Sequence, residues 1–180
     1  MRTGLLVSSG VAAVALGVAD TVYRTRQWGA TAREAAMPLP GDRLVTDPAR
    51  SVTRGVTVEA APEDVWGWVV EVGRARGGVE LVPGRSMVLL GGLDDAAARA
   101  PRDAVTTLHV VPLTGRGQRG AGSAPRCRLV CRSRARRTNA LATAASVVLE
   151  PVGLVLTRRL LLGVKDRAER AAVRTSVATA

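Results

Sequence analysis

Apolar and polar residues alternate along several stretches of the chain, which is the pattern of β-strands with one buried face. In the first stretch Val52, Val56 and Val58 alternate with Thr53, Thr57 and Glu59. Similar patterns predict further strands, two around the Pro83-Gly84 turn in 79–90, one over 104–112 and one over 126–134. The connections between successive strands favour an antiparallel sheet.

Two other stretches have the period of a helix. After Pro62, a residue that suits a first helical turn, Val65, Trp68, Val69 and Val72 recur at helical spacing until Gly73. A second helix is predicted to start at Pro151 and to continue past Ala168, with basic residues toward its end. Because 140–162 is largely apolar, a second transmembrane helix is the alternative interpretation of this region, but Glu150-Pro151 interrupts it.

The N-terminus carries an uncharged apolar run over 4–19, between Arg2 and Arg24. We interpret 1–23 as a membrane anchor, with Thr21 to Tyr23 reaching the interface, because the run alone is short for a spanning helix. A cleaved signal peptide is the alternative, since Gly17 to Ala19 are small residues, and the protein would then be secreted. The arginines that follow the run favour a cell-membrane protein whose domain is cytoplasmic.

The remaining chain is expected to hold a single folded domain. Prolines and glycine in 24–49 indicate an extended linker, with one short helical turn before Pro38. The domain is assigned to 50–174 and a disordered tail to 175–180.

Positive charge is concentrated in the second half of the chain, which has a formal net charge of +11. In the predicted strand over 126–134, the even-numbered arginines share one face and Cys127, Leu129 and Cys131 share the other. Such a basic face favours an anionic membrane surface or a nucleic acid as partner. Because this region has no aromatic stacking residues, nucleic acid is the less favoured of the two, and a solvated or lipid-facing basic surface is expected.

The residues that carry chemistry indicate neither a cofactor nor a metal site. On a strand, Cys127 and Cys131 lie about 13 Å apart, too far for a mutual disulfide, so both are expected to be free thiols. The string Gly115 to Gly120 matches a dinucleotide-binding pattern but lies between two strands, where a basic hairpin loop is the better interpretation. His109 has no evident carboxylate partner, and no catalytic residue is assigned.

Several short segments together resemble the SRPBCC (START-like, polyketide cyclase/dehydrase and lipid transport) superfamily, in its actinobacterial membrane-anchored form. They are WGAT at Trp28, LPGD at Leu39, the segment 56–73, VPGR at Val82 and the segment from Glu150 to Arg170. The resemblance implies an α+β helix-grip fold, in which a curved antiparallel sheet surrounds a long C-terminal helix and an apolar cavity lies between them. The chain is shorter than that pattern after Gly78.

The resemblance leads us to expect a non-catalytic protein that binds a hydrophobic or lipid-like molecule at the membrane face. Alternatives are a polyketide-cyclase-like enzyme, a family member that has lost its ligand, and a basic nucleic-acid-binding module. The expected cavity residues are Trp66, Trp68, Val69, Met87, Leu89, His109, Leu129 and Val155. The oligomeric state stays open.

Overall fold

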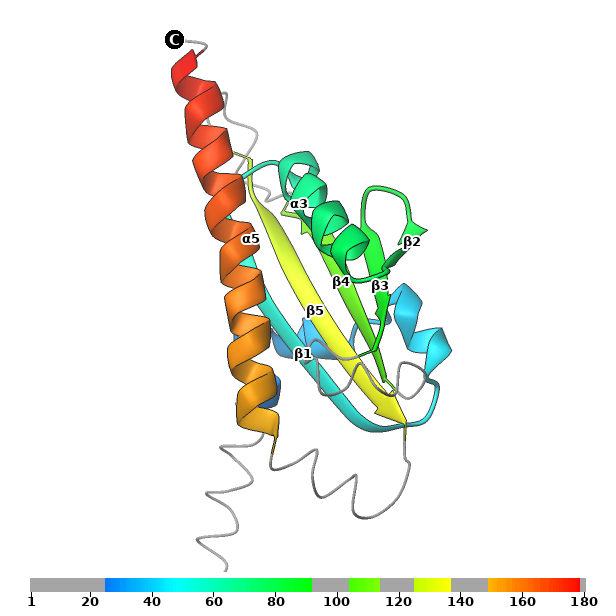
Figure 1. The fold of residues 1–180 in the computed structure, drawn as a ribbon. Coiled ribbons are helices and arrows are strands. Elements are labelled where there is room, and N and C mark those ends of the chain that lie inside the picture. The colour runs from blue at the N-terminus through cyan, green and yellow to red at the C-terminus, as the bar shows by residue number, and fades with distance from the viewer. Residues whose placement is uncertain (1–24, 92–103, 114–124, 137–148, 179–180) are drawn as a thin grey trace, which may run out of the picture.

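The computed structural model describes residues 25–91, 104–113, 125–136 and 149–178, which form an α+β fold (Figure 1). The elements are α2 (Ala32–Ala36), the 3-10 helix η1 (Pro40–Leu44), β1 (Pro48–Val58), α3 (Pro62–Ala75), β2 (Val79–Val82), β3 (Ser86–Leu90), β4 (Ala104–Pro112), β5 (Cys127–Arg136) and α5 (Glu150–Ala178). The expected α+β class, with a curved antiparallel sheet and a long C-terminal helix, is confirmed.

The five strands form one sheet in the order β1-β5-β4-β3-β2, and every neighbouring pair is antiparallel. The strands predicted from alternation are present, and β4 has the predicted bounds. β4 and β5 are direct neighbours, so the glycine-rich string between them, which lies outside the described residues, joins two antiparallel strands. This connection is unlike the strand-to-helix turn of a dinucleotide site.

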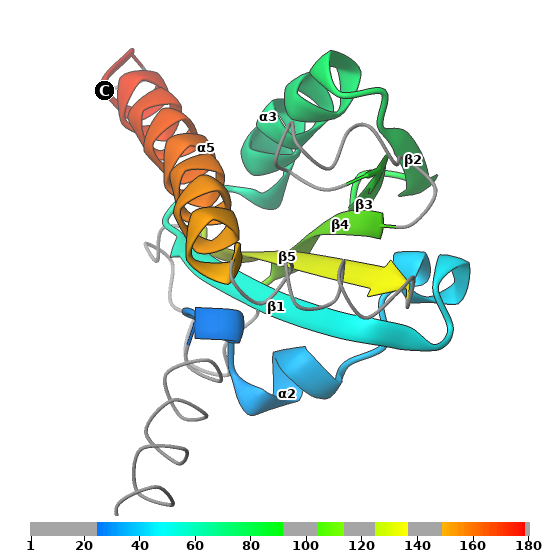
Figure 2. The same ribbon diagram turned by 60° about the horizontal axis from the view of Figure 1, so that its bottom comes forward.

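One face of the sheet is covered by α3 and α5 (Figure 2). α5 buries Thr157, Leu161, Val164 and Ala168, which recur every three or four residues along one side of the helix. Apart from Thr157, these residues belong to one core cluster with the apolar side of α3 and with three side chains of β5, namely Cys127, Leu129 and Cys131.

The opposite face of the sheet is covered by the segment before β1, in which α2 and η1 lie (Figure 2). Leu39 and Val45 are buried there, and Val45 packs with Val88 and Val105 in a second small core cluster. Gly41 is pressed so close to β4 that a side chain at this position would collide with Thr107. The described part of 24–49 is therefore a packed layer of the domain, and its interpretation as an extended linker is wrong.

Arginines of β5 hold this N-terminal layer on the sheet. Arg128 makes a two-pronged ion pair with Glu34, at 2.7 and 2.8 Å, and Arg134 donates to the main-chain oxygen of Asp42. Burial works to raise the pKa of Glu34, but the hydrogen bond and charge of Arg128 keep that pKa below its ordinary value. Among the arginines of the predicted basic face, the Arg126 side chain is more exposed than those of Arg128, Arg132 and Arg134, and it forms an ion pair with Glu59. The expectation that this face is solvated or lipid-facing is thus wrong for Arg128, Arg132 and Arg134, which lie between two layers of protein.

Arg132 is the most deeply buried of these arginines, with 4% of its surface exposed. Its guanidinium has five N–H groups, and each has a partner. The acceptors are the Thr53 hydroxyl, the Asp42 carboxylate and the main-chain oxygens of Glu34, Ala35 and Met37, at 2.6 to 2.9 Å. Three of the five acceptors are carbonyls at the end of α2, which the short helix leaves without internal partners.

The structure describes almost all of the C-terminal end of the chain but not its first 24 residues. α5 continues to Ala178, so the expected disordered tail is helical over 175–178. Residues 1–24, which include the predicted anchor, lie outside the described residues. Within the described part, no helix combines the length and apolar character needed to cross a membrane.

We predict that Arg132→Met destabilises the fold by about 3 kcal/mol, because it leaves the Asp42 carboxylate and several buried carbonyls without a donor. Urea unfolding followed by circular dichroism would measure the loss. Arg170→Met is the matched control, since Arg170 pairs with Asp166 at the surface of α5, and such a pair contributes about 0.5 kcal/mol or less. Equal stability of the two variants would contradict the proposed role of Arg132.

Candidate functional site

The space between the sheet and α5, where the resemblance implies a cavity, contains the core of the domain. Four of the predicted cavity residues, Val69, Met87, Leu89 and Leu129, are at most 4% exposed and belong to this core cluster. Leu108 and Leu161 fill the space between them from β4 and α5. These four residues are therefore brought together as core packing.

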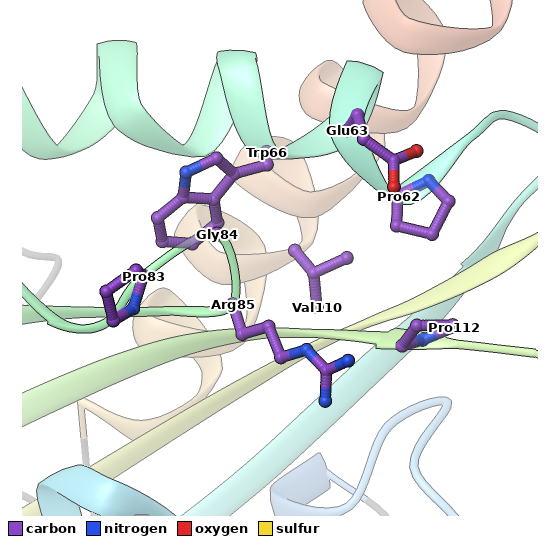
Figure 3. Close-up of a pocket in the computed structure, with 8 residues that line it drawn as sticks. All are labelled: Pro62, Glu63, Trp66, Pro83, Gly84, Arg85, Val110 and Pro112. Atoms are coloured by element: carbon purple, nitrogen blue, oxygen red, sulfur yellow. The ribbon is translucent and has the colours of Figure 1, made fainter.

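A pocket of about 270 Å³ lies instead on the other side of α3, between the first turns of that helix and the β2–β3 turn (Figure 3). Its wall is mostly apolar and includes the Trp66 indole, which lies above Pro83 and Gly84 (Figure 3). The other lining residues are Pro62, Glu63, Arg85, Val110 and Pro112. Glu63 is the acidic group at the rim, and the guanidinium of Arg85 points away from the indole.

The other tryptophans have different surroundings. Trp68 packs against the core cluster, and the guanidinium of Arg167 on α5 lies 5.5 Å from its ring centre. Trp28 is covered by Arg158 in the same way, at 5.2 Å. Both are cation–π contacts that hold α5 in place. Of the two predicted α3 tryptophans, Trp66 lines the pocket and Trp68 joins α3 to α5.

Two predicted cavity residues, His109 and Val155, lie outside both the core cluster and the pocket beside Trp66. His109 is on the sheet face that carries the N-terminal layer, because it shares that face with Thr107, whereas Leu108 and Val110 point to α3 and α5. Val155 lies near the start of α5 and is 48% exposed. Neither residue lines the described pocket.

His109 has a polar partner that sequence reasoning missed. Its Nδ1 lies 2.5 Å from the Ser86 hydroxyl, in the cross-strand pair of β3 and β4. Burial lowers the pKa of His109; a hydrogen bond with the main chain of Arg85 opposes this shift, and the charge of Arg85 adds to it. A serine beside a neutral imidazole resembles a nucleophile and its base. However, Ser86 is fully buried, so no substrate can reach its hydroxyl in this structure.

A second buried cluster joins the start of α5 to β1. Glu150 is 2% exposed and accepts from Arg50 at 2.7 Å and from Arg54 at 2.8 Å. Arg54 also donates to Thr157 and to the main-chain oxygens of Gly153 and Thr25. Burial lowers the pKa of Arg54, and Glu150 opposes this effect. These contacts join β1 to the first turns of α5 and so hold the helix in its place on the sheet.

The sequence contained a signal for one of these missed features. In an extended strand Arg54 lies on the same face as Val52, Val56 and Val58, so the alternation pattern indicates a buried arginine on that face. A buried arginine requires a partner, and Glu150 stands at the start of the apolar helix. The pocket had no comparable signal, because the approach of the β2–β3 turn to α3 depends on tertiary packing.

The described residues include no group of three or more His, Cys, Asp or Glu side chains arranged to hold a metal ion. Cys127 and Cys131 are both free and buried. Burial raises the pKa of Cys127 to about 11 and that of Cys131 to about 12. At neutral pH both are protonated thiols, which are poor nucleophiles and poor metal ligands.

The comparisons with known proteins give no family for this chain. No family model matches the sequence, and no curated protein matches it.

We predict that both thiols resist alkylation in the folded protein and react fully in denaturant. The physical reason is their burial under α3 and α5, which excludes the reagent and suppresses the thiolate. Counting thiols with a chromogenic disulfide, with and without denaturant under non-reducing conditions, would measure this. A count below two in denaturant would show that a disulfide forms and would contradict the strand geometry.

Proposed function

We propose that this protein binds a compact hydrophobic molecule in the pocket beside Trp66. The observation that carries the proposal is the composition of the pocket wall, in which an indole, a valine and three prolines surround a hollow whose charged lining residues are Glu63 and Arg85. Binding sites for small molecules combine an apolar wall with few polar groups in this way. The proposal involves binding and no reaction.

The size of the pocket limits the ligand. Sites for drug-sized molecules measure roughly 300–1,000 Å³, and this pocket has about 270 Å³. A molecule with one or two rings suits it, whereas a sterol or a whole phospholipid would extend far into solvent. A ring system of that size buries roughly 150–250 Å², which corresponds to roughly 4–6 kcal/mol and a Kd of roughly 30 µM to 1 mM before the cost of immobilisation.

We further propose that the domain is a shortened helix-grip protein of the SRPBCC type that residues 1–23 hold at the cytoplasmic face of the cell membrane. The sheet that curves beside a long C-terminal helix supports the fold part of this proposal (Figure 1). The filled space between α5 and the sheet is the main difference from that pattern. A ligand that reaches the pocket from the membrane or from solution would bind between the first turns of α3 and the β2–β3 turn.

Two other functions have less support. Nucleic-acid binding would need free basic groups, and Arg128 and Arg132 are engaged with Glu34, Asp42 and main-chain oxygens. A polyketide-cyclase-like reaction would need polar groups at the ligand. Glu63 is the carboxylate at the rim of the pocket, and His109 lies on the other face of the sheet.

We predict that equilibrium dialysis finds saturable binding of indole or naphthalene, half-saturated no tighter than roughly 30 µM. Trp66→Ala should weaken this binding at least about tenfold, since it removes the largest apolar surface of the wall. Trp68→Ala is the matched control, because Trp68 lies on the same helix and contacts α5 instead. It should leave binding unchanged.

The ligand series also tests the size limit. Palmitate and cholesterol should bind no better than the compact probes, because most of their surface would stay in water. Failure of every compound to bind folded protein would disprove the proposed function. Strong binding that Trp66→Ala leaves intact would place the site elsewhere.

We predict that the full chain sediments with membranes, and that a chain starting at Thr25 is soluble. The shortened chain keeps the contacts of Thr25 and Arg26 with Arg54 and Glu150, so its fold should be retained. Ultracentrifugation of cell extracts, with an alkaline carbonate wash, would measure the difference. Release of the full chain by the wash would argue against an anchor, and mass spectrometry that finds cleavage after Ala19 would favour the signal peptide.

A further inference from the structure

The described chain begins beside the start of α5. Arg54 Nε donates to the main-chain oxygen of Thr25 at 3.1 Å, and Arg26 lies 3.8 Å from Glu150, the first residue of α5. The apolar run 4–19 of the sequence therefore joins the domain within a few residues of this end of the helix. Figure 1 places the beginning of the described chain behind the first turns of α5.

The same end of α5 carries exposed apolar side chains. Leu149, Val152 and Val155 are 47%, 50% and 48% exposed. Val152 and Val155 lie on the side of the helix opposite the one that Thr157 and Leu161 bury against the sheet, and Leu149 immediately precedes the helix. Leu149 also ends an uncharged run of the sequence that starts at Thr138. Three exposed residues of this kind in two turns form a patch that water solvates poorly.

The charges around the patch have one predominant sign. On the sheet-facing side of the first turn of α5, Arg26, Arg50 and Arg54 surround the single carboxylate of Glu150, and this cluster, in which Arg54 and Glu150 are buried, keeps an excess of positive charge. Arg158 and Arg159 are exposed in the following turn of α5. An apolar patch with a basic surround matches the interface of a bilayer that contains anionic lipid.

We propose that Leu149, Val152 and Val155 form a membrane-docking surface, on which the start of α5 rests in the interface of an anionic bilayer. This inference rests on the membrane attachment proposed above. It fixes an orientation, because the attached chain and the apolar patch meet at one end of the domain. The other end of α5 then points away from the lipid.

The other end of the helix supplies a matched control. Val173 and Val177 are 62% and 73% exposed, so they are at least as accessible as Val152 and Val155. Val152 and Val173 are separated by about 31 Å along the helix, at 1.5 Å per residue. When α5 stands on its first turns, as proposed, that separation runs away from the bilayer and exceeds the roughly 5–10 Å depth to which apolar side chains enter it. A helix that lies flat would also bring Val173 to the lipid, because it shares the side of Val155, so quenching of all four labels would overturn the proposed orientation.

The test uses the full chain in vesicles of phosphatidylcholine and phosphatidylglycerol. Val152→Cys, Val155→Cys, Val173→Cys and Val177→Cys are each labelled with an environment-sensitive fluorophore, and the unsubstituted chain measures background labelling of Cys127 and Cys131. We expect brominated lipid to quench the labels at 152 and 155 at least about twofold and to leave those at 173 and 177 nearly unchanged. Val152→Glu with Val155→Glu should abolish quenching at a label on Leu149→Cys.

Each other result overturns the docking surface in a recognisable way. A chain that does not sediment with the vesicles lacks the attachment itself. A chain that sediments while all four labels stay unquenched is attached in another orientation. Labels at 152 and 155 that are already shifted to the blue without vesicles show that the patch is covered by protein, either a second copy or another part of the same chain.

Discussion

Burial of the Arg132 guanidinium is the constraint on which much of the fold depends. A charged group with five N–H donors is stable inside a protein only when each donor has an acceptor. β1 supplies one of these acceptors, and the segment before β1 supplies the rest. Apart from the segment before β1, in which α2 and η1 lie, no described part of the chain covers Arg132 and the neighbouring Arg128 on this face of the sheet. The N-terminal layer is thus a necessary part of the domain.

This arrangement gives the two faces of the sheet different means of attachment. Beside α5, short apolar side chains such as Val58, Leu129 and Ala168 form the main core. The polar contacts of Arg54 with Glu150 and Thr157 join β1 to the start of the helix at the edge of this core. On the opposite face the layer is held mainly by hydrogen bonds and ion pairs from β5, with the small cluster of Val45, Val88 and Val105 at its edge. Hydrogen bonds to a fixed set of carbonyls are directional, so they determine the position of the layer as well as its stability.

The strands and helices could be predicted from the sequence because each depends on a local period. β4, the β2–β3 turn and the helix after Pro62 all follow from the spacing of valines, leucines and prolines. The role of the arginines could not be predicted in the same way. Alternation places Arg128 and Arg132 on one face, but an arginine that reaches water and one that binds a carbonyl have the same pattern. Only the path of residues 25–47 over that face distinguishes the two cases.

For the candidate site too, the sequence indicates which residues are apolar and does not indicate how tightly they pack. Helical spacing predicts that Val65 and Val69 are buried, and the resemblance implies a cavity beside Trp66, yet neither indicates whether a neighbour leaves space beside these residues. In the core, Leu108 and Leu161 fill that space. Beside Trp66, the rigid Pro83-Gly84 turn and the prolines of α3 and β4 cannot fold into the gap, so it stays open.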